Sequence, residues 1–134
     1  MNRKLILFVS SFMFFFAGST DLSPEYYFNS WEQSGADGMY FLLPDGDYLL
    51  FAKGEGAALH EVGHISDRER GYVSKSPVFE EAVIDYLESA DPNEQPYWRI
   101  NYFYEQGLLD EVYAEFYVWN ILYSIPQEME PFYN

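Results

Sequence analysis

Two short apolar runs around a turn give the clearest hydrophobic pattern in the first half of the chain. Residues 39–43 and 48–52 are each of strand length, and residues 44–47 between them combine Pro, Asp and Gly. Apolar runs joined by such a turn predict a β-hairpin. The preceding residues 20–38 mix turn-forming residues with aromatic ones, and we expect the aromatic side chains of residues 26–31 to pack onto the body of the protein.

Helical periodicity begins directly after the hairpin. Apolar positions in residues 57–65 recur at helical spacing, which predicts a helix over about 56–69. A second helix is expected from residue 77 to about 90. Ser76 can cap its first turn, and Pro77 suits the first helical position because proline has no N–H to leave unpaired.

The last third of the chain predicts a loop, an ambiguous segment and a buried helix. Residues 91–96 contain two prolines and read as a loop, whereas the aromatic residues 97–104 are compatible with a strand or a helix. Gly107 ends that segment. Residues 108–124 are apolar on nearly every side, as in a buried helix, and Pro126 follows them. These elements together predict an α+β fold: a hairpin or short sheet packed on two helices.

The first 19 residues have the pattern of a secretory signal. Arg3 and Lys4 precede an apolar run over residues 5–16, and residues 17–19 are small, as at a cleavage site. The run is short for a membrane span, which needs about 20 residues. We therefore expect a secreted protein, with an uncleaved N-terminal anchor as the alternative.

Composition narrows the partners of the expected mature domain, residues 20–134. Removal of Arg3 and Lys4 with the signal changes the net charge from −15 to −17, which argues against nucleic acid and against a membrane surface as a partner. The chain has 0 Cys, so a small secreted domain of this kind must be held by its core, a metal or a partner. Aromatic residues make up 21 % of the chain and supply core material, and the length of 134 residues predicts a single domain.

Both histidines of the chain fall in one pentapeptide, residues 60–64, which reads His-Glu-Val-Gly-His. On a helix, His60 and His64 lie one above the other and can bind the same Zn²⁺. Glu61 points away from that stripe and can act as a base, since zinc lowers the pKa of a bound water to about 7. The alternative is a surface helix with two chance histidines.

Two acidic residues on the expected last helix suggest a third ligand. Glu111 and Glu115 lie four apart on one face of a buried helix, where like charges repel and desolvation is costly. A zinc ion held by two imidazoles would compensate one carboxylate, and spacing alone does not choose between the two. Alternatively, both face solvent or pair with arginines such as Arg99. Asp67 either supports a zinc-binding histidine from outside the ligand set or is simply solvated.

The two motifs together resemble the gluzincin metalloproteases. Over about residues 38–125 the chain is most similar to the branch that contains the catalytic domain of anthrax lethal factor and the clostridial Pro-Pro endopeptidases. Residues 111–115 match that branch's second motif, with valine at one position that is usually aromatic. The resemblance implies that Glu111 binds zinc and that Glu115 supports the site. It also implies that Tyr104, seven residues before Glu111, stabilises the oxyanion.

The function expected from these features is a secreted, toxin-like zinc endopeptidase that acts on an extended peptide or protein. Residues 48–52 either pair with that substrate as an added strand or belong to the core. The alternative is a secreted zinc-binding module that binds a partner protein without cleaving it. A zinc hydrolase acting on a non-peptide amide is a third option.

Overall fold

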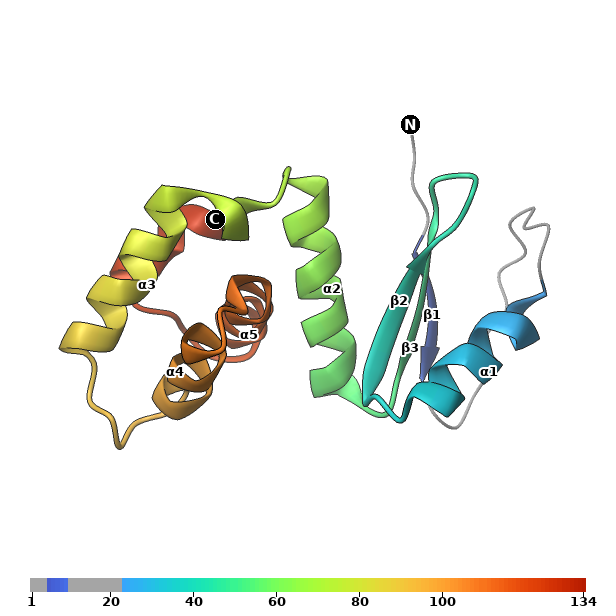
Figure 1. Cartoon of the computed structure of the whole chain (residues 1–134), viewed down its shortest axis with the longest axis horizontal. Coiled ribbons are helices and arrows are strands. Elements are labelled where there is room, and N and C mark those ends of the chain that lie inside the picture. Colours follow the sequence, from blue (N-terminus) through green and yellow to red (C-terminus); the bar gives the residue numbers. More distant parts are fainter. Residues whose placement is uncertain (1–4, 10–22) are drawn as a thin grey trace. The chain divides into compact units, whose positions relative to one another are not determined.

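The computed structural model describes residues 5–9 and 23–134 and has an α+β fold (Figure 1). Its contacts group the chain into two compact units, one ending at Glu61 and the other beginning at Val62. The division falls inside one continuous helix, α2 (Glu55–Glu69), which confirms the helix expected over 56–69. The prediction of a single domain over residues 20–134 stays a prediction.

The first unit contains a three-stranded sheet in the order β1-β3-β2. β2 (Gly38–Leu42) and β3 (Tyr48–Ala52) are antiparallel, so the predicted hairpin is confirmed. Gly46 adopts a φ of 90° in the turn, a left-handed conformation that glycine reaches without steric cost. β1 (Leu5–Val9) pairs with β3 in parallel.

β3 is a core strand. All of its five residues are buried, and its two edges pair with β1 and β2. Burial of all five residues supports the core role for residues 48–52. Removal of residues 1–19 would leave the β3 edge that β1 occupies unpaired, so pairing of this strand with a substrate stays a prediction.

The expected signal segment, residues 1–19, lies outside the described residues except for β1. Its export and cleavage stay predictions. Within the described residues, no helix combines the length and the apolar character that a membrane crossing requires.

Residues 24–34, whose helical structure the hydrophobic pattern did not predict, form helix α1 (Pro24–Ser34). Pro24 occupies its first turn, and Gly35 ends it in the left-handed region with a φ of 69°. Tyr27 and Trp31 are buried, with the Trp31 ring stacked on Phe51 of β3 at a centroid distance of 5.4 Å. The expected packing of these aromatic residues is thus confirmed, although their neighbour Tyr26 is exposed.

The second unit is helical. α3 (Pro77–Ser89) begins as predicted: the Ser76 hydroxyl accepts a hydrogen bond from the Phe79 amide at 3.3 Å. The ambiguous aromatic segment is helix α4 (Tyr97–Glu105), and the predicted last helix is α5 (Leu109–Leu122). Two 3₁₀ segments, η1 (Val73–Lys75) and η2 (Gln127–Phe132), complete the unit.

The core of this second unit brings together side chains from α3, α4, α5 and η2. Its fully buried members are Phe79, Val83, Ile100, Val112, Tyr113, Phe116 and Met129. Burying a large apolar side chain contributes about 1.5–3 kcal/mol. Three of the seven come from the α5 stretch between Glu111 and Asn120, so the apolar sequence of this helix fixes its position in the unit.

Candidate metal centre

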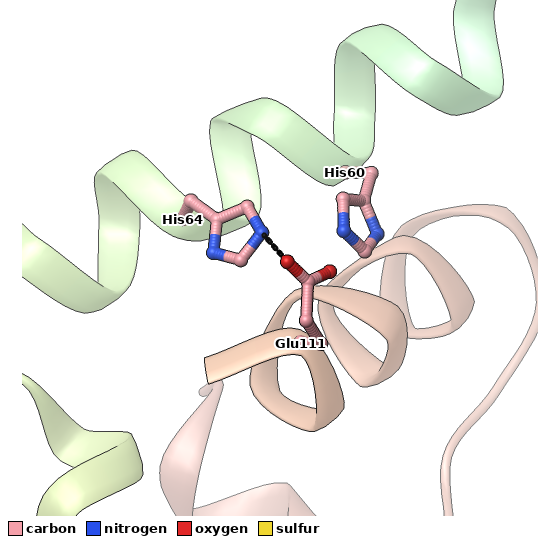
Figure 2. A group of neighbouring side chains, drawn as sticks. All are labelled: His60, His64 and Glu111. Atoms are coloured by element: carbon pink, nitrogen blue, oxygen red, sulfur yellow. Dashed lines mark ion pairs between the residues drawn. The ribbon is translucent and has the colours of Figure 1, made fainter. Parts of the chain in front are cut away.

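Helix α2 carries both histidines on one face, because His60 and His64 are one helical turn apart. Figure 2 shows the two imidazoles side by side, with the Glu111 carboxylate opposite them on α5. The exposed fraction of the His64 side chain is 13 % and that of Glu111 is 29 %, so this pair is partly shielded from water.

Three side chains converge. One ligand atom from each of His60, His64 and Glu111 lies within 4.8 Å of the other two. His64 Nε2 and Glu111 Oε1 are 3.2 Å apart (Figure 2). This group can hold a metal ion.

The donor set fits zinc. Zn²⁺ binds imidazole nitrogen and carboxylate oxygen at about 2.0–2.2 Å in tetrahedral geometry, which places two ligands about 3.4 Å apart. The 3.2 Å separation of His64 Nε2 and Glu111 Oε1 agrees with that spacing. Three protein ligands with two imidazoles and one carboxylate leave a fourth position open, as in catalytic rather than structural zinc sites.

The surroundings of α2 and α5 bring Glu111 to the histidines. Gly63 allows the two helices to approach closely: a Cβ atom at this position would lie 2.9 Å from the Ala114 Cα. Glu111 is in the first turn of α5, where the helix dipole favours a negative charge. The next two residues, Val112 and Tyr113, are fully buried and anchor that turn in the core.

Glu61 lies next to the start of β2. A Cβ atom at Gly38 would be 2.8 Å from the Glu61 Cγ, so only glycine at this strand position leaves room for the glutamate side chain. Glu61 is not one of the three converging groups, in keeping with its predicted place off the histidine stripe.

Glu115 has a different partner from Glu111. Its carboxylate is buried, and its Oε1 lies 3.0 Å from the Arg99 Nε on α4. The expected pairing with an arginine thus holds for Glu115, whose partner is Arg99, whereas Glu111 faces the imidazoles. A supporting role of Glu115 toward a metal ligand stays a prediction.

Asp67 is buried, so the expectation that it is solvated was wrong, whereas its support of a zinc-binding histidine stays a prediction. It is 2 % exposed, and its carboxylate accepts hydrogen bonds from the Ser74 amide at 2.9 Å and the Ser74 hydroxyl at 2.5 Å. The chain turns back after α2 and carries Ser74 to the last turn of the helix. Asp67 therefore stabilises this loop.

Tyr104, the predicted oxyanion donor, is on α4 with its side chain partly buried against the core of the second unit. Its catalytic role stays a prediction.

A stacked pair of tyrosines, Tyr113 and Tyr133, was not predicted. The Tyr113 hydroxyl lies 3.2 Å from the Ser66 hydroxyl and accepts a hydrogen bond from Arg70 at 3.0 Å. The Tyr133 hydroxyl donates to the Tyr113 carbonyl at 2.9 Å, and burial together with Tyr113 and Asp67 raises the Tyr133 pKa well above its usual value. These contacts tie α2 to α5 and to the C-terminal segment. They join positions far apart in sequence, so no local pattern signals them.

Comparison with known proteins gives no assignment: no family model, curated protein or solved structure matches the chain.

Proposed function

We propose that this protein is a zinc-dependent endopeptidase. The main support is the convergence of His60, His64 and Glu111. The two histidines belong to the His-Glu-Val-Gly-His motif on one helix. Glu111 lies on another helix, 47 residues after His64 in the sequence. The resemblance of both motifs to the gluzincins supports a peptidase over other zinc hydrolases.

A zinc ion bound by these residues would supply a Lewis acid for the scissile carbonyl and would lower the pKa of water to about 7. Glu61 accepts a proton from the attacking water as its oxygen adds to the carbonyl carbon. The same carboxylate then gives the proton to the amine as the C–N bond breaks. Tyr104 donates a hydrogen bond to the tetrahedral oxyanion.

The expected substrate is a peptide or protein in extended conformation, and the expected setting is extracellular. Support for the setting is the signal-like pattern of residues 1–19. The net charge of −15 favours neutral or basic substrates through long-range electrostatics.

Digestion of a peptide library by the purified protein tests the proposal. We expect cleavage in the presence of zinc, none after treatment with a strong chelator, and recovery when zinc is returned. Glu61→Gln should retain zinc and lower turnover by about 10²–10⁴, the usual contribution of a general base. Glu55→Gln is the matched control, because Glu55 is an exposed glutamate on the same helix.

Zinc binding without cleavage of any peptide would favour the secreted binding module instead. Wild-type hydrolysis by Glu61→Gln would refute the mechanism.

A further inference from the structure

A cavity in the helical unit shares no lining residue with the candidate metal centre. It measures about 440 Å³ and is lined by the end of α3, the loop that follows it, the end of α5 and the start of η2. Small-molecule sites in proteins usually measure about 300–1,000 Å³, so this volume suits a small ligand or one side chain.

The lining of the cavity is acidic and aromatic. Three carboxylates border it and none of its lining residues is Lys or Arg; the carboxylates are Asp91, Glu94 and Glu128. The aromatic part includes Trp119 and Tyr123, whose ring centroids are 4.5 Å apart. Negative charge beside aromatic faces favours a cation that also has an apolar part, since the face of an aromatic ring attracts cations.

Tyr86 adds a polar group to the lining of the cavity. The residue is only 5 % exposed, but its hydroxyl is not sealed off: it makes no hydrogen bond to another described residue and stays accessible. Burial, followed by the nearby Tyr97, Glu128 and Glu94, raises the Tyr86 pKa to about 12. The phenol therefore stays neutral at physiological pH and can hydrogen-bond a ligand.

A metal ion fits this cavity poorly. Among the described residues, the group whose ligand atoms converge closely enough for a metal is the one at His60, His64 and Glu111, and it includes none of the cavity carboxylates. Spread carboxylates with aromatic walls suit a larger, more weakly hydrated cation.

We propose that this cavity binds an organic cation, an alkylammonium or alkylguanidinium group, with its charge beside Glu94 and Glu128 and its alkyl part against Trp119. Such a group is available as a free amine or as a Lys or Arg side chain of another polypeptide. The proposal does not depend on the metal centre.

Titration of the full chain with n-butylguanidinium chloride, followed by the NMR signal of the Trp119 indole N–H, tests this site. We expect a saturable shift that n-butanol does not produce and that weakens at high salt, where charges are screened. The double variant Glu94→Gln/Glu128→Gln should weaken binding about fivefold to tenfold, because two partly exposed charges are removed. Glu81→Gln, an exposed glutamate on α3 outside the cavity, should leave it unchanged.

Two results would overturn the proposal: a Trp119 signal that the cation does not move, or equal affinities of the wild type and the double variant. A parallel titration separates the sources of the cation. A hexapeptide with one Arg should bind more tightly than n-butylguanidinium if the ligand is a polypeptide side chain, and equally if it is a free amine; its norleucine analogue should not bind.

Discussion

The first and second turns of α5 carry the same side chain in different surroundings. Glu111 in the first turn faces the imidazoles, with His64 Nε2 at 3.2 Å, whereas Glu115 in the second turn is buried beside Arg99. Glu115 therefore has its positive partner within the protein. A cation bound by His60, His64 and Glu111 would balance the Glu111 carboxylate. The difference shows that the surroundings, and not the spacing, separate the two glutamates as candidate ligands.

The largest expected effect separates these two glutamates. Glu111→Gln should lose zinc, because an amide is a much poorer ligand than a carboxylate. Glu115→Gln should lower zinc affinity or activity by no more than about 10–100-fold, as changes of supporting residues do. Equilibrium dialysis against buffered zinc measures both. Equal losses in the two variants would remove the distinction between the two turns.

The next effect concerns turnover without loss of metal. Tyr104→Phe should retain zinc and lower turnover by about 10²–10³, the usual cost of removing one oxyanion donor. Peptidase assays at saturating zinc provide the measurement. Tyr102→Phe is a suitable control, because Tyr102 is an exposed tyrosine on the same helix. An unchanged rate for Tyr104→Phe would exclude this role.

A smaller effect, on stability, tests the close approach of α2 and α5 that places Glu111 beside His64. Gly63→Ala should destabilise the protein by about 1–3 kcal/mol, because the new methyl group would overlap the Ala114 backbone. Gly56→Ala on the same helix meets nothing within 4 Å and should stabilise by about 0.5–1 kcal/mol. Urea denaturation compares the two. A Gly63→Ala variant as stable as the wild type would contradict the packing.

The smallest expected effect tests the Arg99–Glu115 pair in the second turn of α5. Arg99→Gln should cost about 1 kcal/mol, since it leaves the buried Glu115 without its charged partner, while the half-exposed arginine itself is well screened by water. Thermal unfolding of the zinc-loaded protein is the measurement, and zinc content should stay the same. A loss of zinc in this variant would show that the two turns of α5 are coupled.

Much of the fold was predictable because the signals are local. The Pro-Asp-Gly turn, the Ser76-Pro77 helix start and the periodicity of α2 each act within a few residues, and all three elements are confirmed. Helix α1 was missed because its turn-forming residues and its aromatic residues obscure the i, i+4 pair Tyr27 and Trp31.

In the candidate site, too, local patterns were predictable and long-range contacts were not. The motif spacing alone brings His60 and His64 together, and the resemblance to a family selected Glu111. The partners of Glu115 and Asp67 were not predictable in the same way. The Arg99–Glu115 pair joins two helices, and the Ser74 contact depends on how the chain turns back after α2. Such contacts follow from packing, which no short pattern encodes.

X-ray absorption at the zinc edge, with the metal content of the same sample, tests whether His60, His64 and Glu111 bind zinc. We expect one zinc per chain, with imidazole nitrogen and carboxylate oxygen at about 2.0–2.2 Å and a remaining light-atom ligand. We also expect this spectrum to be kept in Glu115→Gln and lost in Glu111→Gln. A purified protein that retains no zinc, or a Glu111→Gln variant with an unchanged spectrum, would contradict this ligand set.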